Sequence, residues 1–103
     1  MKLRWTQGAC DDMVAIANYI AANNETAARE WVHRLRVQAR RATRFPNSGR
    51  VVPEFERGDI REFILRNYRI VYLVGKTDLF VLTVFEGHRQ IRIGRDDLDK
   101  TLA

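Results

Sequence analysis

A chain of 103 residues is the size of one domain, and its 46% hydrophobic and 30% charged residues are typical of a soluble globular protein. No apolar run approaches the roughly 20 residues that a membrane-spanning helix needs. The opening sequence MKLRWTQGACDD turns polar at once, which excludes a signal peptide, and the single Cys10 cannot form an intramolecular disulfide. We therefore expect one domain over residues 1–103, located in the cytoplasm.

The net charge of the chain is +5, and its isoelectric point is about 10.0. This excess of basic residues matches the electrostatic footprint of a nucleic-acid binder. It suits equally well a protein whose partner is acidic. Charge alone does not choose between these two classes.

The N-terminal part of the sequence predicts a short strand followed by a helix. Residues 2–6 alternate Leu3 and Trp5 with charged side chains, which is typical of a strand. Thr6 is a candidate N-cap for the helix that follows, and the pair Asn23-Asn24 ends this helix. The apolar face of the helix consists of residues spaced four, three and four apart: Ala9, Met13, Ile16 and Ile20.

A second helix is expected over residues 25–45, a segment rich in arginine. Its apolar stripe consists of Ala28, Trp31, Leu35, Ala39 and Ala42. Its remaining positions include Arg29, Arg34, Arg36, Arg40, Arg41 and Arg44. Because only a short break separates the two helices, we expect an antiparallel helical hairpin. Pro46 and Gly49 then end the second helix.

From residue 59 onwards the hydrophobic pattern changes to the period of two that strands show. The three segments with this pattern are DIREFILR (59–66), YRIVYLV (68–74) and LFVLTVFE (79–86). The connections between them are short enough for hairpins, which predicts an antiparallel meander. A last helical turn is expected over residues 96–102, with Asp96 as its cap.

This order of elements predicts an α+β domain with two layers. The two amphipathic helices must bury their apolar stripes, and one face of the antiparallel sheet is the surface available to them. The expected order is strand, helix, helix and three strands, followed by the short helical turn.

The sequence contains no pattern that indicates a metal or a cofactor. His33 and His88 are the only histidines, and there is neither a Cys-x-x-Cys pair nor a His-Glu-x-x-His helix. The acidic segment GRDDLDK lacks the glycine and the terminal glutamate of a calcium-binding loop. We therefore expect neither a metal site nor a bound cofactor.

The candidate functional residues are cationic and follow the predicted strands. Arg61 lies on one strand, Arg69 on the next, and His88 and Arg89 at the end of the third. Antiparallel pairing is expected to bring them near one sheet edge, where they could bind phosphates and, through His88, transfer a proton. The alternative is that these arginines keep exposed strands soluble and that some of them pair with Glu54, Glu62 or Glu86.

The order of elements and five segments resemble the ParE/RelE superfamily of type II toxin–antitoxin toxins. The segments are IANYIA, FPNSGR, DIREFIL, YRIVYLV and VFEGHR, and they span nearly the whole chain. The resemblance implies one of two activities. RelE-like members cut messenger RNA in the ribosomal A site without a metal, whereas ParE-like members poison DNA gyrase. It also implies a cognate antitoxin that wraps around the toxin and holds it inactive.

The resemblance carries over to individual residues only in part. Arg69 and Arg89 match arginines that RelE-type nucleases use at the substrate phosphate, and His88 would then act as the acid/base. RelE-type enzymes carry lysines on the strand where this chain has Arg61 and Glu62, and no tyrosine follows position 72. These departures favour the ParE-like branch.

The leading hypothesis is therefore a gyrase-inhibiting toxin, not an enzyme, that forms a hetero-oligomer with a ParD-like antitoxin. The basic helix face and the arginines of the sheet would contact gyrase or its bound DNA. The candidate partner-binding residues are Arg61, Arg69, His88, Arg89, Arg92, Arg95 and Trp31. Tyr19 and Val32 are further possible anchors for the antitoxin, although packing in the core is the favoured role for Trp31. The alternatives are a metal-independent, ribosome-dependent endoribonuclease and a degenerate, non-toxic module that only binds the antitoxin.

Overall fold

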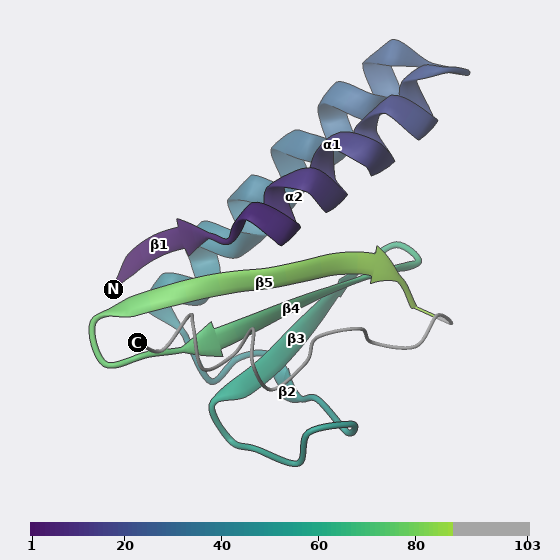
Figure 1. Cartoon of the computed structure of the whole chain (residues 1–103). Coiled ribbons are helices and arrows are strands. Elements are labelled where there is room, and N and C mark those ends of the chain that lie inside the picture. Colours follow the sequence, from purple (N-terminus) through teal and green to yellow (C-terminus); the bar gives the residue numbers. More distant parts are fainter. Residues whose placement is uncertain (88–103) are drawn as a thin grey trace.

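The computed structural model describes residues 1–87, in which two helices pack on one face of a five-stranded sheet (Figure 1). The helices are α1 (Gln7–Ala21) and α2 (Glu25–Arg44). The strands are β1 (Lys2–Trp5), β2 (Arg50–Val51), β3 (Ile60–Leu65), β4 (Tyr68–Val74) and β5 (Asp78–Glu86). The predicted α+β class and order of elements are confirmed, with the short β2 as an addition. The helical turn expected over residues 96–102 lies outside the described residues.

The sheet has the strand order β1-β5-β4-β3-β2 and is mixed, whereas the sequence predicted an antiparallel sheet. The pairs from β2 to β5 are antiparallel, as the short connections indicated. Strand β1 instead lies parallel to β5, with Leu3 opposite Leu79. After the helical hairpin, β3 starts from the same end of the sheet as β1. The two hairpins that follow reverse the chain twice, so β5 runs in the same direction as β1. A pairing between residues so distant in sequence leaves no local pattern.

Side chains at the start of α1 cover the outer edge of β5 beyond its pairing with β1. The hydroxyl of Thr6 accepts a hydrogen bond from the amide of Ala9 (3.1 Å), which confirms Thr6 as the N-cap. The same hydroxyl donates to the carbonyl of Leu82 (3.1 Å). One oxygen of Asp12 accepts hydrogen bonds from the hydroxyl of Thr83 (2.7 Å) and the amide of Val84 (3.0 Å). These bonds satisfy backbone groups that an open edge strand would expose.

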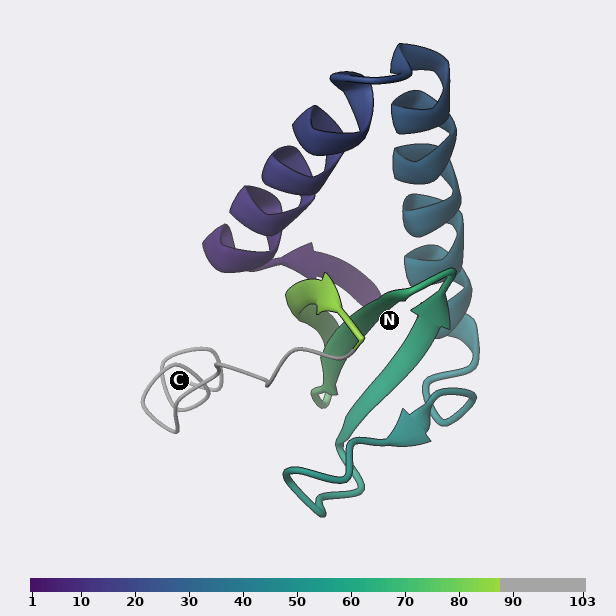
Figure 2. The same ribbon diagram turned by 90° about the vertical axis from the view of Figure 1, so that its right-hand side faces the viewer.

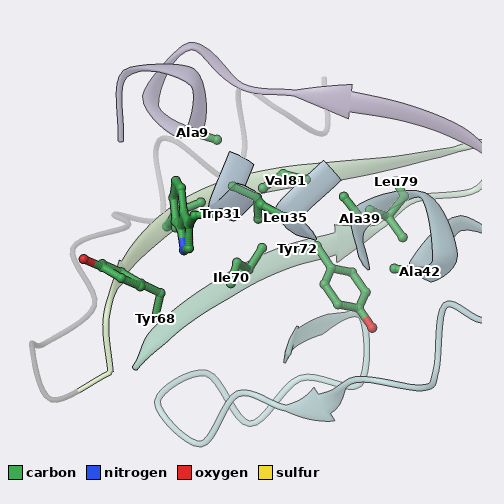
Figure 3. Close-up of a cluster of buried hydrophobic side chains, with 11 residues drawn as sticks. Ala9, Trp31, Leu35, Ala39, Ala42, Tyr68, Ile70, Tyr72, Leu79 and Val81 are labelled. Carbon is green, nitrogen blue, oxygen red and sulfur yellow. The ribbon is translucent and has the colours of Figure 1, made fainter. Parts of the chain in front are cut away.

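The main core lies between the helices and the sheet (Figure 3). The predicted apolar stripe of α2 is fully confirmed, since Ala28, Trp31, Leu35, Ala39 and Ala42 are all buried. They face Ile70, Tyr72, Leu79 and Val81 of the sheet. In the predicted stripe of α1, by contrast, only Ala9 is buried, and Met13, Ile16 and Ile20 are partly buried. Helix α2 thus contributes more buried side chains to this core than α1 does.

A second, smaller core covers the opposite face of the sheet. It consists of Val52, Ile60, Val71, Leu73 and Leu82. Figure 2 shows the helices on one side of the sheet and the segment that joins β2 to β3 on the other. Strand β4 therefore has both faces covered, which explains why nearly its whole length is buried.

Neither helix in residues 1–87 could cross a membrane, because α1 is too short and the longer α2 is too polar.

The segment FPNSGR folds over the hydroxyl group of Tyr72. This hydroxyl donates to the carbonyl of Pro46 (2.8 Å) and accepts from the amide of Gly49 (3.0 Å). A Cβ atom at position 49 would lie 2.6 Å from the carbonyl oxygen of Glu62 and would also collide with the Tyr72 hydroxyl. The glycine of the Pro-x-x-Gly-Arg motif is therefore required by close backbone approach and not by an unusual φ angle.

We expect the substitution Gly49→Ala to lower the free energy of unfolding by about 1–3 kcal/mol, since neither the β3 backbone nor the buried Tyr72 can move away easily. Gly58→Ala is the matched control, because a Cβ atom added at that position would have nothing within 4 Å of it. This control should change the free energy by less than about 0.5 kcal/mol. Urea denaturation of the two variants measures both values, and equal stabilities would contradict the steric argument.

Candidate functional site

The two strand arginines of the predicted cationic cluster lie on opposite faces of the sheet. In the β3–β4 ladder Arg61 is opposite Tyr72 and Arg69 is opposite Ile64, so the two arginines are three positions apart. Because side chains alternate between faces, an odd separation places them on different faces. Pairing thus brings Arg61 and Arg69 close along the ladder, as expected, but does not join them in one cluster.

Arg61 organises the loops around the end of the sheet. Its guanidinium donates hydrogen bonds to the carbonyls of Gly58 (3.0 Å), Gly49 (2.9 Å) and Asn47 (3.3 Å). These bonds tie β3 to the segments that precede and follow β2. The side chain remains partly exposed, so its charge still reaches the surface.

Arg69 lies in an ionic cluster on the face opposite the helices, and within it Arg69 and Glu62 are buried. Its Nε and Nη2 atoms donate to the carboxylate of Glu62, and its Nη1 and Nη2 atoms donate to that of Glu54 (2.9 Å each). Arg50 donates from its Nε to the same Glu62 carboxylate (3.2 Å). The Arg69 guanidinium also stacks over Phe85, 5.1 Å from the ring centre. We call these four charged residues, Arg50, Glu54, Glu62 and Arg69, the ionic cluster.

The carboxylates of the ionic cluster stabilise the charged form of Arg69. The hydrogen bond from Arg69 lowers the pKa of Glu54 below its usual value, and the hydrogen bonds from Glu54 and Glu62 raise the pKa of Arg69 further. Arg69 is only 7% exposed and Glu62 is fully buried. Four N–H groups of the guanidinium therefore already face carboxylates, which confirms the interpretation that Glu54 and Glu62 pair with a strand arginine.

A signal for this cluster is present in the sequence. Glu62 lies on the same face of β3 as Ile60 and Ile64, and Arg69 lies on the same face of β4 as Val71 and Leu73. A carboxylate and a guanidinium at apolar positions of neighbouring strands predict a buried ion pair, since an unpaired buried charge is very costly. The sequence positions of Arg50 and Glu54 do not predict that these two residues contact the buried ion pair.

The other predicted site residues divide between the core and the end of the chain. Trp31 is 2% exposed and packs edge-on against Tyr68, with ring centres 5.3 Å apart, so it lies in the core and not on the surface. At the end of β5, the amide of Gly87 donates to the carbonyl of Asn67 (2.7 Å), beside the start of β4, as expected. The remaining candidates lie outside the described residues and stay predictions: His88, Arg89, Arg92 and Arg95.

Within residues 1–87, no group of three histidine, cysteine, aspartate or glutamate side chains is arranged to hold a metal ion.

We expect the substitution Arg69→Met to destabilise the protein by about 3–5 kcal/mol, because it leaves the Glu62 carboxylate buried without its main cation. The control is Arg4→Met, which breaks the surface pair with Asp78 and should cost far less than Arg69→Met does, because the Arg4 side chain is 54% exposed. Adding Glu62→Leu to Arg69→Met should restore part of the loss. Urea denaturation at neutral pH measures all three variants, and a cost for Arg69→Met no larger than that of Arg4→Met would refute the role of the ionic cluster.

Comparisons with known proteins extend the description from the fold to the family. The family model described as the ParE toxin of type II toxin-antitoxin system, parDE, matches residues 3–91. A solved structure described as the chromosomal ParDE TA system from P. aeruginosa is similar in fold, with a TM-score of 0.68 and 22% sequence identity over 84% of this chain and 95% of that chain. Among curated proteins no match is found. Since the family model covers most of its length, the chain belongs to the ParE toxin family of type II toxin–antitoxin systems.

Proposed function

We propose that this toxin acts in the cytoplasm by inhibiting DNA gyrase and that a ParD-like antitoxin neutralises it in a hetero-oligomer. Membership of the ParE toxin family makes the chain the toxin component of a toxin–antitoxin system and gives it an antitoxin as partner. The target and the contacts are the proposed part. The choice of target rests on one observation: the guanidinium of Arg69 is already hydrogen-bonded to carboxylates.

An arginine that binds the scissile phosphate of an RNA must have N–H donors to offer. In this chain the donors of Arg69 are engaged by Glu54 and Glu62, and the side chain is nearly buried. Releasing it would leave Glu62 buried without its main cation, a loss of about 3–5 kcal/mol before any phosphate is bound. Arg61 lies on the opposite face of the sheet and cannot join it at a common phosphate. This arrangement supports gyrase inhibition over RNA cleavage.

Two features support sites for the antitoxin. On α1 the partly buried Ile16 and Ile20 adjoin Tyr19, which is 72% exposed, so the helix presents an incompletely covered apolar side that we call the α1 apolar face. The second feature is the edge of β3. Strand β2 pairs only with Arg61 and Glu62 of β3, so within the described residues the remaining residues of β3 have no strand partner on that edge. A helix on the first feature and an added strand on the second are both known modes of peptide recognition.

The gyrase proposal is tested with purified full-length protein in two reconstituted assays. In the presence of gyrase and supercoiled DNA we expect trapped cleavage complexes, seen as broken DNA after denaturation of the enzyme. With ribosomes and bound message we expect intact RNA. The variant His88→Ala should weaken gyrase trapping only by the loss of one candidate contact, because no proton transfer is involved. Message cleavage that falls about 10²–10⁴-fold in His88→Ala would instead establish the nuclease alternative.

The antitoxin site is tested by two substitutions on α1. Tyr19→Ser removes the exposed aromatic ring of the α1 apolar face and should weaken antitoxin binding about tenfold, or by about 1.4 kcal/mol. Val14→Ser is the matched control, because Val14 is also exposed (54%) but lies about 140° away around the helix. Isothermal titration calorimetry gives both affinities, and melting curves should show both free toxins as stable as the wild type. An equal loss of affinity in the two variants would place the antitoxin elsewhere.

A further inference from the structure

The outward side of α2 concentrates most of the net positive charge of the molecule. The helix carries six arginines against two glutamates, so it supplies four of the five net charges of the chain. Both glutamates, Glu25 and Glu30, lie near its N-terminal end. The arginines are all exposed, and we call them the α2 arginine face: Arg29, Arg34, Arg36, Arg40, Arg41 and Arg44.

Within residues 1–87, no ion pair neutralises the α2 arginine face. The ion pairs among the described residues are made by Arg4, Arg50, Arg57 and Arg69, none of which lies on α2. The ionic cluster on the far side of the sheet consists of two arginines and two glutamates, so it adds no net charge. The field around the described part of the molecule is therefore strongest along this helix.

The arrangement of the arginines also costs stability. Arg36, Arg40 and Arg44 follow one another at intervals of four residues, and Arg41 lies three residues before Arg44. Like-charged side chains at these spacings repel one another and destabilise the helix. Surfaces that face only water normally intersperse both signs of charge, yet no acidic residue follows Glu30 on this helix. A row of repelling charges without local compensation indicates an external polyanion.

We propose that the α2 arginine face binds the phosphate backbone of double-stranded DNA. From Arg29 to Arg44 the helix extends about 22 Å, at 1.5 Å per residue. A duplex of that length carries roughly a dozen phosphates, counting both strands. All the cations of the helix are arginines, whose planar guanidinium groups bind phosphate oxygens in pairs. The opposite side of α2 is buried in the core, so the arginines are presented from a fixed support.

DNA fits this surface better than an acidic protein does. The centres of protein interfaces are depleted of charge and built around apolar or aromatic side chains. On α2 the one large exposed apolar side chain is Val37 (44%), and Phe45 lies just beyond the helix end. The apolar surface suited to a protein partner lies instead on α1. The inference goes beyond gyrase inhibition, because the contact is with DNA itself and requires no enzyme.

The test measures the binding of the full-length toxin to a fluorescein-labelled duplex of about 20 base pairs by fluorescence anisotropy, at about 50 and 200 mM salt. The variant Arg36→Gln/Arg40→Gln/Arg44→Gln removes three charges from the α2 arginine face. If each arginine contacts one phosphate, the slope of log affinity against log salt should fall by about 2.7. Over this fourfold rise in salt, the wild type should then lose about 40-fold more affinity than the variant. Two duplexes of unrelated sequence should bind equally.

The control Lys2→Gln/Arg66→Gln/Lys76→Gln removes the same charge from exposed positions outside α2 and should keep most of the wild-type salt slope. Equal losses in both triple variants would overturn the inference, because net charge alone would then explain the binding. Polyglutamate that binds the wild type more tightly than DNA does, and loses that affinity in the α2 variant, would overturn it in favour of an acidic protein. Should the first variant not fold, Arg29→Gln/Arg34→Gln/Arg41→Gln tests the same face. Because gyrase is absent, failure here leaves the proposed function intact.

Discussion

The burial of Glu62 is the constraint on which the sheet side of the molecule depends. A carboxylate with no exposed surface in the middle of a sheet is tolerated only if cations and hydrogen bonds replace its water. Arg69 on the neighbouring strand and Arg50 on the short β2 supply them. Glu54 accepts hydrogen bonds from the Arg69 guanidinium, and this contact holds the segment after β2 over the second core. One buried charge thus joins two strands, the edge strand and a loop.

This constraint separates two kinds of arginine in the described part of the molecule. A phosphate-binding arginine needs an electrostatic environment that leaves its charge unsatisfied until the ligand arrives. In this chain Arg69 on β4 is neutralised by the carboxylates of Glu54 and Glu62 at contact distance. The unsatisfied positive charge lies instead on α2, on the outside of the helical layer. The unpaired positive charge of the described residues is therefore spread over a broad surface.

Most of the fold could be predicted from the sequence because its elements are local. The stripe Ala28–Trp31–Leu35, the cap Thr6 and the period-two strands all follow from short-range patterns. The parallel pairing of β1 with β5 could not, since the partners are far apart in sequence. The placement of Arg61 and Arg69 on opposite faces of the sheet could be predicted only in two steps. A two-residue turn at Arg66-Asn67 fixes the register, and the register fixes the faces, so the pattern already contained the answer.

The two helices are held in contrasting ways, and this contrast sets what each surface can bind. Five side chains of α2 are buried, so tertiary packing holds the helix firmly enough to offset the repulsion that its arginines impose. Only one side chain of α1 is buried, and the hydrogen bonds that Thr6 donates to β5 and Asp12 accepts from β5 fix chiefly its first turns. The outer part of α1 therefore has apolar surface left to cover, whereas the outer side of α2 has charge left to neutralise. A partner that gains energy from covering apolar area is directed to the first helix, and a polyanion to the second.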